Sequence, residues 1–225
     1  MERGRVVLGA IEVKELRAGY GSGDVLGGLT FTVDRGEKVA IMGPNGAGKT
    51  TLMRVLLRMI PYRGGARILG MEVKEIPQIE LVRHASFMLP GDFVEDMMVG
   101  TYMELAGVEM GEDVFDVGHL MGRRLRSLSS GELQRVRLSR VFWSGREVLI
   151  LDEPFAHLDP MYQIRLVEAI RGYGGTILFS IHDVLLAIRF FDRFILMKDG
   201  MLVSRSLSPR SFRETFGVSL HIFVG

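Results

Sequence analysis

Apolar runs of strand length alternate with helical periods along the chain, and this pattern predicts an α/β fold. Lys38–Met42, Val148–Leu151 and Thr176–His182 are mostly apolar. Such runs are typical of parallel strands that are covered on both faces. After the first run, apolar residues follow at helical spacing: Leu52, Val55, Leu56 and Met59. This spacing predicts a helix a few residues after the strand.

The start of the chain has a different pattern. Ile11–Leu16 alternates apolar and polar residues, which predicts a half-buried strand, and Val25–Val33 predicts one or two more. Tyr20 falls in a glycine-rich turn between them. Further strands are predicted over Arg67–Leu69, Ala85–Leu89, Arg193–Lys198 and Met201–Ser204. Further helices are predicted over Ile79–Arg83, Pro160–Ile170 and Pro209–Phe216, with a small helical insertion over Gly107–Gly122.

Composition narrows the possible functions without naming one. The 225 residues suffice for one α/β domain, and 28 basic against 27 acidic residues predict no nucleic-acid surface. The chain has no cysteine, which excludes disulfides, thiolate metal sites and thiol catalysis. No apolar run approaches the ~20 residues that span a bilayer. We also expect no secretion signal at the N-terminus, because no basic region precedes an apolar core there.

The strongest local signal is Gly43–Thr50, which we call the phosphate loop. Its sequence, Gly-Pro-Asn-Gly-Ala-Gly-Lys-Thr, fits G-x-x-x-x-G-K-[ST] at every fixed position. It lies between a predicted strand and a predicted helix, which is the context that this motif requires. Backbone N–H groups of such a loop surround phosphate oxygens, Lys49 reaches the outer phosphates, and the Thr50 hydroxyl is suited to hold Mg²⁺.

Three polar side chains follow two of the predicted parallel strands. Asp152 and Glu153 end one strand, and His182 ends another. The carboxyl edge of an open α/β sheet is where ligands bind. We therefore expect Asp152 to hold Mg²⁺ and Glu153 to polarise an attacking water. The competing interpretation is a solvated acidic turn.

Other features have a structural and a functional interpretation. Ser129 and Glu132 form a predicted capping box, which already explains both residues. Tyr20 is suited to stack on a flat base or to pack in a turn. The methionine-rich stretch 94–105 is either core or an adaptable docking surface.

In their order along the chain, these motifs resemble those of the ATP-binding subunits of ABC transporters. The resemblance covers nearly the whole chain. In its first half, Tyr20 matches the family's adenine platform and Gly43–Thr50 its phosphate loop. In its second half, Leu128–Glu132 matches the LSGGQ signature, Val148–Glu153 the Walker B strand with its catalytic glutamate, Ala156–Asp159 the D-loop, and His182 the switch histidine.

The resemblance implies a fold and a division of the chain. The expected fold is an α/β P-loop NTPase of ABC type, with a mainly parallel core sheet, an N-terminal antiparallel β subdomain and a small helical subdomain. Residues 1–225 would form a single ABC ATPase domain. Residues 1–89 and 145–225 would make the core, and residues 90–144 or so would make the helical subdomain.

The resemblance also implies a site that two subunits share. Two subunits, identical or paralogous, would pair head to tail around two ATP molecules, with Mg²⁺ as cofactor. The implied catalytic residues are Glu153 and His182. The implied nucleotide contacts are Tyr20, Gly43, Asn45, Gly46, Ala47, Gly48, Lys49, Thr50, Thr51 and Asp159. Ser129 and Gly131 would complete the site of the partner subunit. Transmembrane permease subunits would be the partners, with the chain in the cytoplasm at the inner face of the membrane.

The sequence departs from the family pattern at two places. Where the family has a Mg²⁺-sensing glutamine after the strand Ala85–Leu89, this chain has Pro90 or Gly91. Our hypothesis is that Asp92 takes over, because a carboxylate is a competent Mg²⁺ ligand. The signature reads Leu-Ser-Ser-Gly-Glu, and its final glutamate is a common variant in importers of metal chelates, which favours that type.

Two other functions stay open at this point. One is a soluble ABC ATPase that moves no solute, such as an ATPase of Fe–S cluster assembly. The other is a nucleotide-binding switch with little turnover, which the missing glutamine suggests and which the intact Glu153 and His182 argue against.

Overall fold

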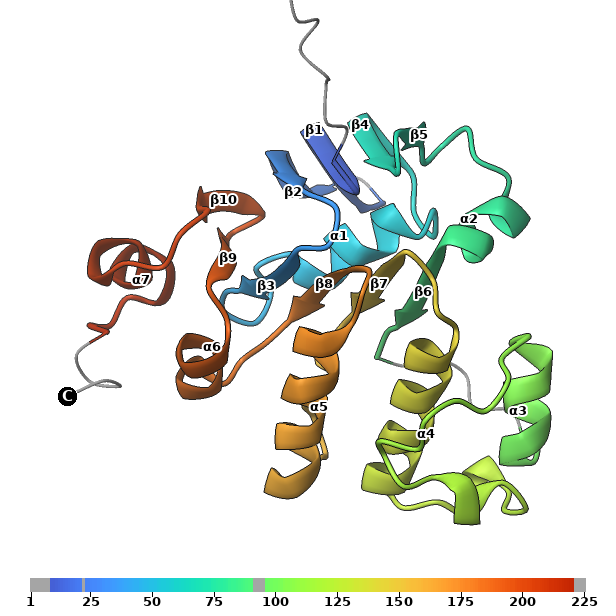
Figure 1. Ribbon diagram of the computed structural model, residues 1–225. Helices are drawn as coiled ribbons and strands as arrows, with labels where there is room; N and C mark the ends of the chain where they lie inside the picture. Colours follow the sequence, from blue (N-terminus) through green and yellow to red (C-terminus); the bar gives the residue numbers. More distant parts are fainter. Residues whose placement is uncertain (1–8, 22, 91–95, 221–225) are drawn as a thin grey trace, which may run out of the picture.

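A computed structural model describes residues 9–21, 23–90 and 96–220. Within these residues, an antiparallel sheet packs over a mostly parallel sheet, with helix α1 between them and most other helices on the far side of the core sheet (Figure 1). The observed architecture confirms the expected α/β fold with a mainly parallel core sheet and an antiparallel N-terminal sheet. Among the described helices, none is long and apolar enough to cross a bilayer.

The antiparallel sheet comes from the first part of the chain. In spatial order its described strands are β2 (Gly23–Val33), β1 (Ile11–Tyr20), β4 (Tyr62–Ile68) and β5 (Met71–Glu72). Strand β1 is longer than its alternating pattern predicted, because irregular register around Glu15 lets it continue to Tyr20. Tyr20 pairs with Gly23 across the hairpin, so it ends a strand and does not lie in the turn.

The core sheet holds the other described strands. Their spatial order is β10 (Met201–Ser204), β9 (Arg193–Lys198), β3 (Lys38–Met42), β8 (Thr176–Ser180), β7 (Val148–Leu151) and β6 (Ala85–Met88). All neighbours are parallel except β9 and β10. Their hairpin turn has positive φ at Asp199 and Gly200, a conformation that the Asp-Gly pair favours in two-residue hairpin loops.

Alternation along the core strands divides their side chains between two apolar clusters. Val39 and Ile41 pack with the antiparallel sheet and α1, whereas Ala40 and Met42 pack with the helices on the other face. Because successive side chains of a strand point to opposite faces, an apolar run is required where both faces are covered. This confirms the interpretation of these runs as buried parallel strands.

The described helices follow the strands in turn. They are α1 (Lys49–Leu56), α2 (Gln78–His84), α3 (Val99–Leu105), α4 (Ser130–Trp143), α5 (Pro160–Gly172), α6 (Val184–Phe190) and α7 (Pro209–Phe216), with 3₁₀ turns at Gly118–Leu120 and Leu125–Ser127. The pattern missed α6, which Asp183 caps by accepting the Leu186 N–H at 2.9 Å. Each such cap contributes about 1 kcal/mol to helix stability.

The prediction of a helical insertion over Gly107–Gly122 is wrong. The structure has only the short 3₁₀ turn there, and the rest is irregular. The Asp113 carboxylate accepts the N–H groups of Val117 and Gly118, each at 2.8 Å. Such side-chain bonds give the backbone an alternative to helix, and Asp116 adopts a positive φ. The division of the chain at residues 90–144 or so stays a prediction.

The helix after the phosphate loop is also shorter than predicted. It ends at Leu56, Arg58 takes a positive φ of 56°, and Met59 is exposed. The apolar position at Met59 therefore continues the helical spacing in the sequence but not the helix itself.

Candidate functional site

The site forms where β3, β7 and β8 end side by side at the carboxyl edge of the core sheet. A cleft of about 450 Å³, which we call the phosphate cleft, opens there. Its lining residues are Val25, Asn45, Gly46, Ala47, Gly48, Lys49, Thr50, Thr51 and Glu153. The structure thus brings most of the predicted phosphate loop together with the predicted catalytic glutamate.

The glycines of the phosphate loop are required by its geometry. Gly46 and Gly48 have φ of 81° and 94°, a region that side chains with a Cβ rarely adopt. A Cβ on Gly43 would lie 2.1 Å from the Met197 carbonyl oxygen. The loop therefore folds tightly enough to aim its N–H groups, and the start of α1, at an anion.

Lys49 is held over the loop. Its ammonium group donates to the carbonyl oxygens of Gly43 at 2.8 Å and Pro44 at 3.1 Å. Burial lowers the pKa of Lys49, and the carboxylates of Asp152 and Glu153 oppose that change. An ammonium has three hydrogens. Two carbonyls use two of them, so one stays available for a phosphate oxygen.

Asp152 is buried, and both of its carboxylate oxygens accept hydrogen bonds. Thr50 Oγ1 donates to Oδ2 at 2.5 Å, and Ser180 Oγ donates to Oδ1 at 2.6 Å. A hydroxyl and a carboxylate in contact are the oxygen ligands that Mg²⁺ takes when phosphates and waters fill its other positions. The residues present therefore fit the ion, which Thr50 and Asp152 would hold.

Glu153 and His182 are in direct contact. The distance from His182 Nε2 to Glu153 Oε1 is 2.9 Å, and both side chains are partly exposed. Glu153 has a positive φ of 50°, which is uncommon for a residue with a side chain. The amide of Gln134 donates to the carbonyl oxygen of Pro154 at 2.9 Å and that of Glu153 at 3.4 Å, so α4 supports this turn.

The signature residues lie apart from the phosphate cleft. Ser129, Gly131 and Asp159 line another hollow of about 130 Å³. In Figure 1 the first turn of α4 lies at the end of the helix away from the strands. No residue lines both spaces. Within the described part of this chain, the signature therefore does not complete the phosphate cleft.

The capping box at the start of α4 is confirmed. Glu132 Oε2 accepts the Ser129 N–H at 2.7 Å, and Ser129 Oγ accepts the Glu132 N–H at 3.2 Å. The first of these bonds lowers the pKa of Glu132. Arg123 adds an ion pair to Glu132 at 2.8 Å. The glutamate that departs from the family pattern thus has its own cationic partner.

Tyr20 is exposed and does not line the phosphate cleft. Its hydroxyl accepts a hydrogen bond from Arg54 at 2.9 Å, and the guanidinium carbon lies 6.0 Å from the ring centre. Its role as an adenine platform stays a prediction. Asp159 caps α5 by accepting the Tyr162 N–H at 3.2 Å, and its contact with nucleotide likewise stays a prediction.

The segment after β6, where the sequence lacks the expected glutamine, begins beside Asp152. Leu89 and Pro90 line a hollow of about 170 Å³ together with Asp152 and Glu153. Asp92 and Gly91 lie outside the described residues. The hypothesis that Asp92 replaces the missing glutamine therefore stays untested.

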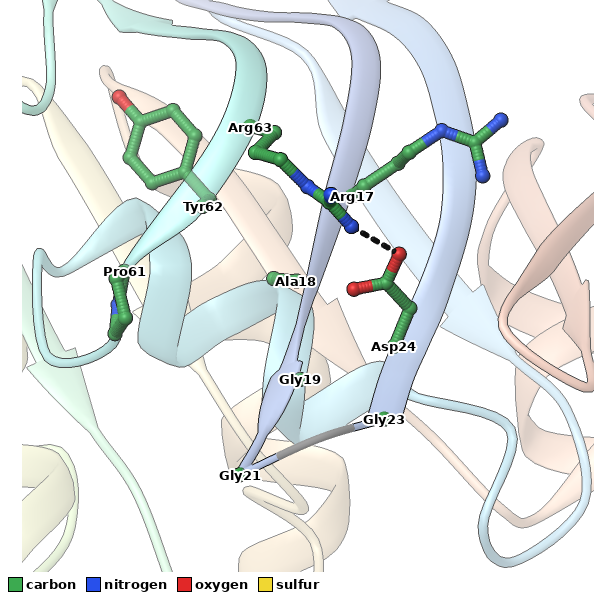
Figure 2. A pocket seen from close by; sticks show the side chains of 9 residues that line it. All are labelled: Arg17, Ala18, Gly19, Gly21, Gly23, Asp24, Pro61, Tyr62 and Arg63. Atoms are coloured by element: carbon green, nitrogen blue, oxygen red, sulfur yellow. Dashed lines mark hydrogen bonds and ion pairs between the residues drawn. The ribbon is translucent and has the colours of Figure 1, made fainter.

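A further cleft opens beside the β1–β2 hairpin and the start of β4 (Figure 2). It measures about 370 Å³, and Arg63 forms an ion pair with Asp24 at 2.6 Å on its wall. Its lining residues are Arg17, Ala18, Gly19, Gly21, Gly23, Asp24, Pro61, Tyr62 and Arg63. None of them was predicted as a site residue, and none of them lines the phosphate cleft.

Three residues near the site were not singled out from the sequence. Val25 lines the phosphate cleft, Gln134 supports the Glu153 turn, and Ser180 contacts Asp152 and Glu153. A polar residue at the end of an apolar strand, two positions before His182, was a signal that pointed to Ser180. Val25 and Gln134 gave no comparable signal.

Comparison with known proteins finds similarity along most of the chain. The model of the ABC transporter family matches residues 26–156. The chain is 31% identical to the hemin import ATP-binding protein of Pseudomonas putida over 93% of each chain. It is 34% identical to the hemin import ATP-binding protein of Bradyrhizobium diazoefficiens, over 86% of this chain and 81% of that one. A solved structure of an ATP-binding subunit of an ABC transporter aligns with a TM-score of 0.80 at 26% identity, over 96% of this chain and 98% of that one.

The placement of Lys49 predicts the effect of replacing it. We expect Lys49→Met to weaken ATP binding by about 10–100-fold, the loss of one charge-assisted hydrogen bond to phosphate. Isothermal titration calorimetry with ATP measures this loss.

A matched control comes from the opposite end of β3. Lys38 also donates to two carbonyl oxygens, of Gly36 and Gly175, and burial also lowers its pKa. Lys38→Met should leave ATP affinity unchanged. Equal losses in the two variants would show that Lys49 acts through fold stability and not through phosphate.

Proposed function

The chain belongs to the ABC transporter family, and from this premise we propose that it powers the import of hemin through separate membrane subunits. As a family member it is an ATPase subunit that hydrolyses ATP to drive transport. Its similarity to hemin import ATPases supports import as the direction of transport. The observation that supports hemin as the solute is similarity to hemin import ATPases along nearly the whole chain. Hemin is a metal chelate, which agrees with the type that the signature favours.

ATP binding would use the phosphate cleft. The N–H groups of the loop would surround the phosphates, and the free hydrogen of Lys49 would reach the outer ones. Thr50 and Asp152 would hold Mg²⁺, which neutralises phosphate charge when it is bound. Tyr20 would contact the base at the other end of the nucleotide.

Hydrolysis would use the contact between Glu153 and His182. We infer that Glu153 orients and polarises the attacking water, because Glu153 lines the phosphate cleft. His182 is bonded to Glu153 at 2.9 Å in this structure. When nucleotide is present, the imidazole would turn to the γ-phosphate and leave the carboxylate free to accept a proton from water.

A second ATPase subunit would complete each site. The support is that Ser129 and Gly131 line a hollow separate from the phosphate cleft, at the start of a helix whose dipole favours an anion. Head-to-tail pairing would place Ser129 and Gly131 of one subunit against the γ-phosphate bound by the other. Opening of the pair after hydrolysis would move the permease subunits at the inner face of the membrane.

The alternatives from the sequence are weaker now. Similarity to importer ATPases over most of each chain favours transport over a soluble role such as Fe–S cluster assembly. The contact between Glu153 and His182 beside the phosphate loop favours turnover over a passive nucleotide switch.

The role of Glu153 predicts a separation of binding from turnover. Glu153→Gln should lower the ATPase rate by about 100-fold or more, the size of a lost general base, with ATP affinity unchanged. Phosphate release under saturating ATP measures this rate. Glu147→Gln is the control, because Glu147 lies at the other end of β7, where it pairs with Arg35. Wild-type turnover no faster than that of Glu153→Gln would refute the assigned role.

The proposed solute predicts a transport result. Proteoliposomes that contain this chain and its permease subunits should accumulate hemin only with ATP on the side of the ATPase. Glu153→Gln should abolish this uptake. ATP-driven uptake of another solute without hemin uptake would contradict hemin as substrate and leave the ATPase assignment intact.

A further inference from the structure

We propose that Ser180 is a positioning residue for ATP hydrolysis, because its hydroxyl joins Asp152 to the backbone of Glu153. This inference rests on the proposed roles of these two residues. It assigns to Ser180 the alignment of the magnesium ligand with the residue that activates water.

Ser180 is fully buried at the end of β8, between the strands that carry the phosphate loop and the carboxylates. A hydroxyl has one hydrogen to donate and lone pairs to accept. Ser180 donates to Asp152 Oδ1 at 2.6 Å and accepts the Glu153 N–H at 2.7 Å. The Ser180 hydroxyl thus acts as a donor to one residue and as an acceptor from the next. These two hydrogen bonds together fix its rotation.

The first bond orients the Asp152 carboxylate. With Oδ1 held by Ser180, Oδ2 faces Thr50 Oγ1 at 2.5 Å. These two oxygens are the proposed protein ligands of Mg²⁺. Partners that hold a metal ligand in place are worth about 10–100-fold in metal affinity or activity. Without Ser180 the carboxylate would be free to rotate away from Thr50.

The second bond anchors an unfavourable backbone conformation. Glu153 has φ of 50°, which for a residue with a side chain needs support from its surroundings. Ser180 holds its N–H, and Gln134 holds the carbonyl oxygen that follows, at Pro154. With both sides of the turn fixed, Glu153 lines the phosphate cleft and its carboxylate contacts His182.

Burial alone does not give a serine this arrangement. Ser139 of α4 is also fully buried, yet its hydroxyl has no hydrogen-bond partner among the residues that the structure describes. Ser139 is therefore a matched control for the loss of a buried hydroxyl.

The decisive experiment compares Ser180→Thr with Ser180→Val. The two side chains have nearly the same shape, and only threonine keeps the hydroxyl. The readouts are kcat and KM for ATP, the affinity for ATP with and without Mg²⁺, and the melting temperature.

We expect kcat of Ser180→Val to be about 10–100-fold below that of Ser180→Thr. ATP affinity without Mg²⁺ should be equal in both, whereas the gain in affinity that Mg²⁺ brings should be smaller in Ser180→Val. Ser139→Ala should match the wild type in every one of these readouts. Ser180→Ala adds no volume, and both its kcat and the gain in ATP affinity that Mg²⁺ brings should be lower than in the wild type.

Equal kcat and equal Mg²⁺ response in Ser180→Val and Ser180→Thr would overturn the proposal. So would a loss of ATP affinity without Mg²⁺ that accounts for the whole fall in turnover, because that pattern marks a structural role. Absence of turnover in the wild type would refute the proposed function instead, and the Mg²⁺ response of binding would still decide the role of Ser180.

Discussion

The burial of the Asp152 carboxylate is the constraint on which the site depends. A charge that is only 3% exposed is costly unless hydrogen bonds satisfy it. Its two oxygens accept hydrogen bonds from Thr50, in the segment after β3, and from Ser180, at the end of β8. Strands β3, β8 and β7 must therefore end at one level, and that register also brings Glu153 and His182 together. The alignment of these strand ends therefore serves both the burial of Asp152 and the proposed chemistry.

Much of the fold could be predicted from the local sequence pattern. The elements that were mispredicted have identifiable physical causes. Strands β3, β9 and β10 and helix α7 have the predicted bounds, because turn or capping residues delimit each of them. Strand β1 and the segment after α3 were mispredicted because a bulge at Glu15 and side-chain bonds from Asp113 replace regular patterns. The partners of Ser180 lie about 28 residues away in sequence, and only the register of β7 and β8 brings them into contact.

The phosphate loop could be identified from its own sequence, whereas the role of the signature could not be derived from one chain. The function of Gly43–Thr50 depends on its backbone conformation, and the glycines in the sequence indicate that conformation. In the proposed pairing the signature acts on the nucleotide of a second subunit, whereas within one chain Ser129 and Glu132 form a capping box. Arg123 beside Glu132 supplies a local reason for glutamate at the last signature position. Contacts within the chain thus explain the structure of the signature, and its action at a partner's nucleotide rests on the proposed pairing.

The central claim is that one chain holds half of each ATP site, and subunit mixing tests it most directly. Lys49→Met removes the phosphate contact of one half, and Ser129→Asp keeps a good helix cap while it sets a negative charge toward the partner's γ-phosphate. Each variant alone should hydrolyse ATP poorly. A mixture should regain turnover, because a mixed pair unites the intact Lys49 of one subunit with the intact Ser129 of the other. A mixture no more active than its separate components would contradict the account.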